Sequence, residues 1–151
     1  MGSKAKTMKF FCLPILMFLF SNSVQAQQDV VKWTASYDAE QSSIILKAKM
    51  EKDWVIYSQE HVEDGPIPTS FEFEEVAGVS YTGKVEPLSA PIIVESEVFM
   101  TEVKKYKKEA IFSQKVELQD DSVVVKGTVT YMACDSKRCL APKTIPFEVK
   151  I

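Results

Sequence analysis

The sequence predicts an all-β domain, an immunoglobulin-like antiparallel β-sandwich. Three observations support this prediction: apolar and polar residues alternate over many short segments, turn-forming residues separate the segments, and no segment shows the sustained apolar stripe of a helix. Alternation with a period of two is the pattern of a strand with one buried face. Seven or more short strands in a chain of this length are typical of two packed sheets.

Six of the expected strands have the clearest pattern, and they follow in order along the chain. The first two show alternation of apolar with mostly polar or small residues, the third alternates phenylalanine with acidic residues, and the last three are rich in β-branched and aromatic residues. They span residues 31–37, 44–50, 71–73, 110–118, 123–133 and 145–151. Turn signals lie between them at 38–43, 64–66, 77–78, 86–87 and 119–121. In Val98–Lys108 a short helical turn competes, but the lysines at 104–108 favour a solvated strand or loop.

The N-terminus has the pattern of a cleaved signal peptide. Three lysines precede the apolar run 10–20, and Val24-Gln25-Ala26 has small residues where a signal peptidase cleaves. The run of about 11 residues is shorter than the roughly 20 needed to span a membrane. We therefore expect residues 1–26 to be removed and 27–151 to form one periplasmic or secreted domain that does not insert into the membrane.

The charge of the mature chain argues against a nucleic-acid partner. Removal of the signal peptide leaves 15 basic and 21 acidic residues, a net charge of −6. Nucleic acids and anionic membrane surfaces both attract a basic face. The signal peptide also carries Cys12, so two cysteines remain, and a pair in an exported protein is normally oxidised.

The two remaining cysteines, Cys134 and Cys139, lie between two expected strands with four residues between them. A loop of this length forms a hairpin that brings two Cα atoms to the distance of a disulfide. Closing so short a loop stabilises a fold by only about 2 kcal/mol. Lys137 and Arg138 in the loop favour a thiolate, whereas Asp135 opposes it. The spacing alone leaves two interpretations open, a redox-active pair or a plain hairpin disulfide.

Other classes of function have weaker support. Two cysteines and the distant His61 do not supply the four ligands of a structural zinc site, so we expect no metal, and His61 is interpreted as an ordinary surface residue. The sequence contains no G-x-S-x-G motif, which argues against a hydrolase of that type. The main alternative is a secreted binding module in which the disulfide only holds one hairpin together.

The cysteine segment resembles the N-terminal periplasmic domain of DsbD, the thiol:disulfide interchange protein. The resemblance rests on Tyr131-Met132-Ala133-Cys134, on Cys139-Leu140-Ala141-Pro142, and on the closing segment Thr144-Ile145-Pro146. The segments 53–58 and 65–73 are also similar, and the whole mature chain is covered. The resemblance implies an immunoglobulin-like fold whose Cys134–Cys139 pair exchanges electrons. No cofactor is expected, because the electrons reside on sulfur.

The resemblance also implies partners and further site residues. A thioredoxin-like or membrane-embedded DsbD-type reductase would supply electrons, and periplasmic proteins with disulfides would receive them. By analogy Cys139 carries the mixed disulfide and Cys134 resolves it. Phe99 falls at the position of a shielding cap, with Glu97 and Val98 beside it, and the alternative for Phe99 is a core aromatic residue in a strand. Tyr57 and Tyr131 are candidate site-lining residues, with core packing as the alternative.

Two departures from the family pattern stand out. The loop between the cysteines has four residues, whereas the best-known members have five, and Val98 interrupts the cap motif. The chain also ends at Ile151, without the membrane and thioredoxin-like domains of DsbD. We therefore expect its reductant to be a separate polypeptide.

Overall fold

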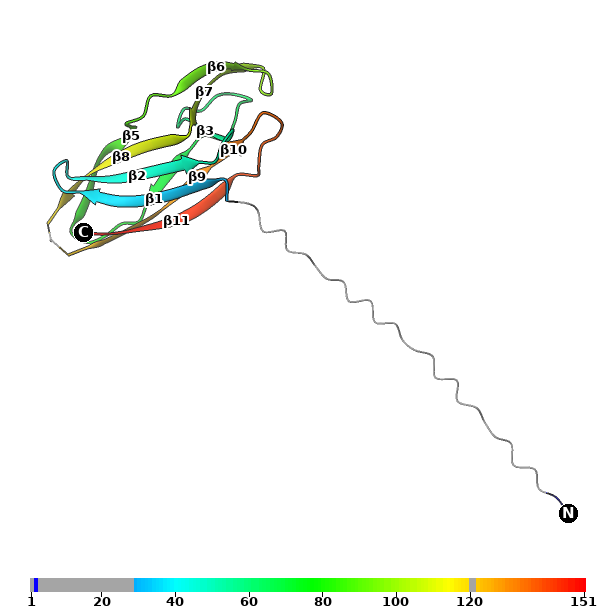
Figure 1. Cartoon of the computed structure of the whole chain (residues 1–151). Helices are drawn as coiled ribbons and strands as arrows, with labels where there is room; N and C mark the ends of the chain where they lie inside the picture. Colours follow the sequence, from blue (N-terminus) through cyan, green and yellow to red (C-terminus); the bar gives the residue numbers. More distant parts are fainter. Residues whose placement is uncertain (1, 3–28, 120–121) are drawn as a thin grey trace.

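The computed structural model describes Gly2 and residues 29–119 and 122–151, and the predicted signal peptide lies almost entirely outside them. The described chain forms three antiparallel sheets (Figure 1). The first sheet has the order β1-β2-β8-β5, with β1 at Val31–Asp38, β2 at Ser43–Met50, β5 at Val79–Pro87 and β8 at Glu109–Leu118. The described part contains no helix that is long and apolar enough to cross a membrane.

The second and third sheets complete the sandwich. One has the order β11-β9-β4, with β4 at Ser70–Phe73, β9 at Val124–Tyr131 and β11 at Lys143–Lys150. The other has the order β10-β3-β7-β6, with β3 at Val55–Tyr57, β6 at Ile92–Ser96, β7 at Thr101–Lys107 and β10 at Ala133–Cys134. These four short strands lie together at one end of the molecule (Figure 1).

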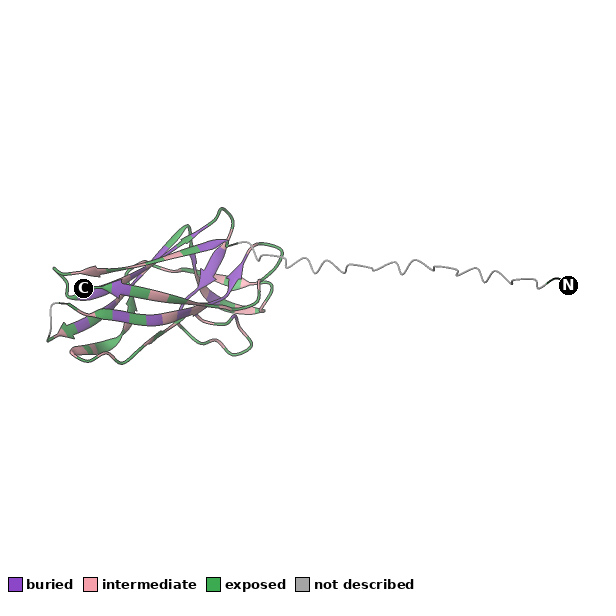
Figure 2. Ribbon diagram, turned by 90° about the horizontal axis from the view of Figure 1, so that it is seen from below, coloured by how far each residue is buried: buried purple, intermediate pink, exposed green. Residues whose placement is uncertain are grey.

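The main core lies between the first sheet and the sheet β11-β9-β4. Phe112 in β8 is 0% exposed, and its ring lies 5.0 Å from that of Phe71 in β4 and 6.0 Å from that of Trp33 in β1. Buried residues alternate with exposed or partly buried ones along β8 and β9. Figure 2 shows such changes of burial along the strands of the sandwich by colour. The period-two pattern of the sequence therefore buries one face of each strand, which confirms the all-β prediction.

Two details differ from the sequence prediction. Glu86 and Pro87, expected in a turn, end β5, where they pair with β8 after a register shift. The stretch 98–108 is neither helical nor fully solvated, because it contains the end of a hairpin turn and then strand β7, in which Val103 and Tyr106 are buried. The lysines between these two residues masked the buried face, since their long aliphatic stems tolerate partial burial.

Candidate redox site

The two cysteines face each other across the hairpin that follows β10. Cys134 and Cys139 form a disulfide, and their Cα atoms lie 4.0 Å apart. The backbone hydrogen bonds of the hairpin lie on either side of them: Leu140 N donates to Ala133 O, and Asp135 N donates to Arg138 O, both at 2.9 Å. The cysteines therefore occupy a non-hydrogen-bonded pair of an antiparallel ladder, the position at which facing side chains are closest.

The tip of the hairpin is closed by the side chain of Asp135. Its Oδ1 accepts hydrogen bonds from Lys137 N at 2.7 Å and from Arg138 N at 2.8 Å. These two backbone bonds favour the ionised carboxylate, so they lower the pKa of Asp135 below its ordinary value. An aspartate that accepts bonds from the backbone two and three residues later is a common way to start a tight turn.

The two sulfur-bearing residues differ in exposure. Cys134 is 2% exposed and pairs with Val55 in β3, whereas Cys139 is exposed on the return side of the hairpin. Nucleophilic attack on a disulfide requires access to one sulfur. Of the two residues, Cys139 is the more accessible to a partner.

Cys134 belongs to a small second core, which we call the end cluster. Its buried members are Val55, Tyr57, Val103, Met132 and Cys134, and Val94 and Phe99 pack against them. Phe99 lies in the turn between β6 and β7, and its ring meets that of Tyr57 edge to face at 5.8 Å. Burial also raises the pKa of Tyr57. The structure thus brings together three of the sequence-predicted site residues, Cys134, Phe99 and Tyr57.

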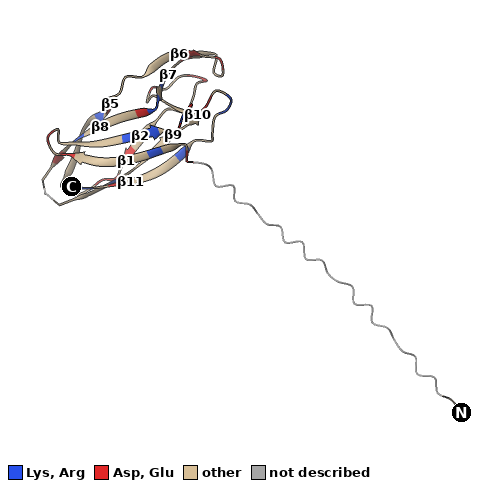
Figure 3. Cartoon of the chain, in the orientation of Figure 1, with Lys and Arg blue, Asp and Glu red and all other residues tan. Residues whose placement is uncertain are grey.

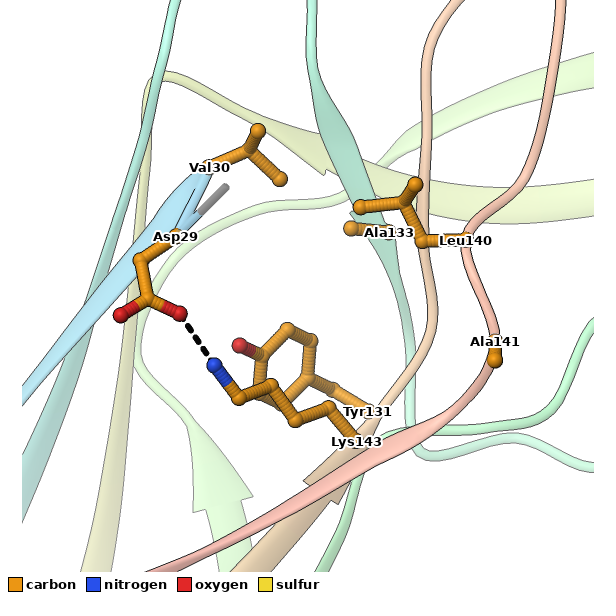
Figure 4. Close-up of a pocket in the computed structure, with 7 residues that line it drawn as sticks. All are labelled: Asp29, Val30, Tyr131, Ala133, Leu140, Ala141 and Lys143. Carbon is orange, nitrogen blue, oxygen red and sulfur yellow. Dashed lines mark hydrogen bonds and ion pairs between the residues drawn. The ribbon is translucent and has the colours of Figure 1, made fainter. Parts of the chain in front are cut away.

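The other two predicted lining residues lie elsewhere. Tyr131 points into the main core, where its ring lies 5.6 Å from that of Trp33, because it continues the face of β9 that also buries Val125 and Val129. Tyr131 also lines a small hollow with Leu140 and an ion pair between Asp29 and Lys143 (Figure 4). Glu97 is exposed in the turn that carries Phe99.

The tip of the cysteine hairpin is positively charged. Lys137 and Arg138 are both exposed there, and Figure 3 shows basic residues at the end of the loop that follows β10. The guanidinium carbon of Arg138 lies 6.0 Å from the ring centroid of Trp54, within the range of a cation–π contact. The basic tip contrasts with the acidic balance of the whole chain.

Comparison with known families agrees with this geometry. The family model for the N-terminal region of the thiol:disulfide interchange protein DsbD matches residues 21–150. The chain belongs to the DsbD N-terminal family. As a member it is a thiol–disulfide exchange module. Its two cysteines, Cys134 and Cys139, lie at the distance of a disulfide in the structure. A search of curated proteins found no match.

Solved structures of DsbD N-terminal domains have the same fold. The reduced N-terminal domain of Neisseria meningitidis DsbD is 13% identical, with a TM-score of 0.60 over 81% of this chain and 86% of that one. The complex between the DsbD N-terminal and PilB N-terminal domains of the same species gives 12% identity and a TM-score of 0.57, over 84% of this chain and 88% of that one. These likenesses confirm the immunoglobulin-like β-sandwich.

A third similar structure is a periplasmic domain. The N-terminal periplasmic domain of ScsB from Proteus mirabilis is 17% identical, with a TM-score of 0.54, and the match covers 78% of this chain and 44% of that one. Since the identity is low, this structure too supports the fold of the DsbD N-terminal family and no detail of the site.

Sequence reasoning missed several residues of this site. Met132, Val103 and Val55 join Cys134 in the end cluster, and Asp135 closes the hairpin. One signal was available: Tyr131 to Cys134 are four consecutive residues without charge, and all four are buried, which indicates burial on both faces of the strand. The contribution of Val55 and Val103 has no local signal, because these residues lie far from the cysteines in sequence.

Within the described part of the chain, no three His, Cys, Asp or Glu residues lie close enough together to hold a metal ion. His61 lies exposed in the segment between β3 and β4.

Proposed function

We propose that this domain relays electrons in the periplasm, between a thioredoxin-like or membrane-embedded reductase and client proteins that carry disulfides. The observation that supports this most directly is the unequal exposure of the pair, with Cys139 open to a partner and Cys134 buried. Residues 1–26 would direct export and be removed, leaving 27–151 as the working domain. The complex of a DsbD N-terminal domain with the PilB N-terminal domain supports a protein partner of this kind.

The exchange proceeds in two balanced steps. A partner thiolate attacks Cys139 Sγ, a new partner–Cys139 disulfide forms, and the electron pair of the broken bond stays on Cys134 Sγ, which takes up a proton. A second partner thiolate then attacks the partner sulfur and releases Cys139 as a thiol. The partner leaves with a disulfide, and the domain holds two thiols. The reverse sequence reduces a client disulfide, with Cys134 attacking Cys139 to resolve the mixed disulfide.

Phe99 acts as a cap in this proposal. Its ring covers Tyr57 and the cluster around Cys134, and the turn that carries it also exposes Val98 and Met100, at 71% and 85%. Ile92 and Ile93 are exposed on the adjoining strand β6. Exposed apolar side chains gathered at one place mark protein contact surfaces. A docking partner would cover this hairpin and displace Phe99, which makes exchange selective for proteins.

Trapping of the mixed disulfide tests the proposal. The variant Cys134→Ser leaves Cys139 without its resolving thiol, so a periplasmic partner should remain attached as a covalent adduct that a reducing agent releases. The matched variant Cys139→Ser should trap little, because Cys134 is buried. The reduction potential of the pair should lie above about −300 mV, since structural disulfides lie below that value. A lower potential together with no adduct would support the binding-module alternative.

A further inference from the structure

We propose that Asp135 is a positioning residue, whose carboxylate holds the loop between the cysteines closed whether or not the two sulfurs are bonded. This inference deepens the proposed exchange function and rests on it for its biological role. Asp135 is not a nucleophile, and its side-chain hydrogen bonds are made with backbone amides and not with either sulfur.

The bonds that close the loop are independent of the disulfide. Asp135 Oδ1 accepts from two backbone amides, those of Lys137 and Arg138, and Asp135 N donates to Arg138 O. Two of these bonds join Asp135 to Arg138, the residues next to the two cysteines, and the third joins Asp135 to Lys137 in the turn. When the disulfide breaks, none of these bonds has to break with it. A carboxylate that accepts backbone N–H groups makes stronger bonds than a neutral acceptor.

A second contact ties the return side of the loop to the body of the domain. The guanidinium of Arg138 lies over Trp54, which immediately precedes Val55, the residue paired with Cys134. The side chain of Arg138 therefore contacts the residue directly before the strand that pairs with Cys134. Asp135 binds the backbone of Arg138, and Trp54 contacts its side chain. Cys139 is the next residue in the chain.

The consequence is a high effective concentration of one sulfur near the other. In the mixed disulfide, the Cys134 thiolate must attack Cys139 Sγ, form the intramolecular bond, and expel the client sulfur as a thiolate that is then protonated. Holding the reacting atoms near each other before reaction accelerates such a step. The same effect favours the disulfide over the two thiols at equilibrium, so it makes the reduction potential more negative.

Three variants test the inference through equilibration with glutathione. Asp135→Ala removes the acceptor, and we expect the equilibrium constant for closing the disulfide to fall about tenfold, which is about 30 mV for a two-electron couple. Asp135→Asn keeps a side-chain oxygen that can accept the same amides, and it should stay nearer to the wild type than to the alanine variant. Ser136→Ala, in the same turn, is the control and should leave the constant unchanged.

The rate of resolution gives a second measurement. A glutathione adduct on Cys139 should release glutathione more slowly in the alanine variant than in the asparagine variant. Release of the loop should also change the indole N–H signal of Trp54 on reduction in Asp135→Ala, whereas in the wild type the signal should shift little. The domain has two tryptophans, and Trp33 in the main core serves as the internal reference.

Two results would overturn the inference. Equal shifts in the alanine and asparagine variants would show that the charge of Asp135, and not its hydrogen bonds, acts on the sulfurs. An alanine variant that matches Ser136→Ala would show that the loop stays closed without Asp135. Because glutathione needs no natural partner, these results are separate from failure of the proposed relay, which would show as an absence of trapped protein in Cys134→Ser.

Discussion

Reduction of the disulfide should weaken the fold only modestly. Cys134 and Cys139 are separated by 5 positions, and in the chain-entropy model a loop this short stabilises a protein by about 2 kcal/mol. Reducing the wild-type protein is a cleaner perturbation than replacing the cysteines, because serine at position 134 would also place a hydroxyl group in the end cluster. A module that cycles between two redox states has to remain folded in both.

The same number predicts a shift in redox potential. Oxidation and folding form a closed thermodynamic cycle, so whatever the disulfide adds to folding stability, folding adds to the stability of the disulfide. About 2 kcal/mol corresponds to about 40 mV for a two-electron couple. The folded pair should therefore have a potential about 40 mV below that of the unfolded chain in urea.

Urea unfolding with and without a reducing agent measures the first quantity. With a slope near 2 kcal/mol per molar, the midpoint should fall by about 1 M on reduction, and the reduced domain should still unfold cooperatively. A loss of about 4–5 kcal/mol, the range expected for bridges that close long loops, would refute the argument and identify the bridge as a structural cross-link. A reduced chain that is unfolded in buffer would do the same.

Three further predictions follow from the packing and the hydrogen bonds. Phe99→Ala should speed reduction of the disulfide by dithiothreitol. It should also lower the free energy of unfolding by about 1–2 kcal/mol, less than the roughly 3–5 kcal/mol lost when a fully buried phenylalanine is replaced. Val98→Ala, in the same turn, should change neither the rate of reduction nor the stability. The amide NMR signal of Lys137 should titrate with a midpoint below the ordinary value of 3.8, because the hydrogen bonds from the backbone of Lys137 and Arg138 lower the pKa of Asp135, and a midpoint above 3.8 would contradict this. Phe112→Ala should lower the free energy of unfolding by about 3–5 kcal/mol in urea titrations, and a loss under about 1 kcal/mol would mean that the main core does not depend on it.

Local patterns made most of the fold predictable. The burial of alternate residues in β2, β8 and β9 follows from a pattern with a period of two, which depends only on neighbours in sequence. The short strands were harder to predict. Strand β6 has two exposed isoleucines, and β3 has three residues that are all buried, so neither shows alternation. Their pairing with β7 gives them their structure.

The two faces of the segment that ends at Cys134 pack against different cores. A continuous strand through Tyr131 and Cys134 would place these two residues on opposite faces, with Met132 on the same face as Cys134. The structure keeps this alternation: Tyr131 lies in the main core, whereas Met132 and Cys134 lie in the end cluster. The position of Phe99 was suggested by family resemblance, and its contact with Tyr57 joins residues more than 40 positions apart.

The sequence alone determined that two cysteines, five positions apart at a bend between strands, would meet and bond. A short hairpin brings their Cα atoms within the distance that a disulfide spans. It also determined the alternating strands that form the sandwich. Only the tertiary structure decided which sulfur is exposed, since Cys134 is buried by pairing with Val55 and by packing against side chains from β3 and β7. The physical reason is that burial at this end comes from contacts between distant segments, and no local pattern records which sheet edges will meet.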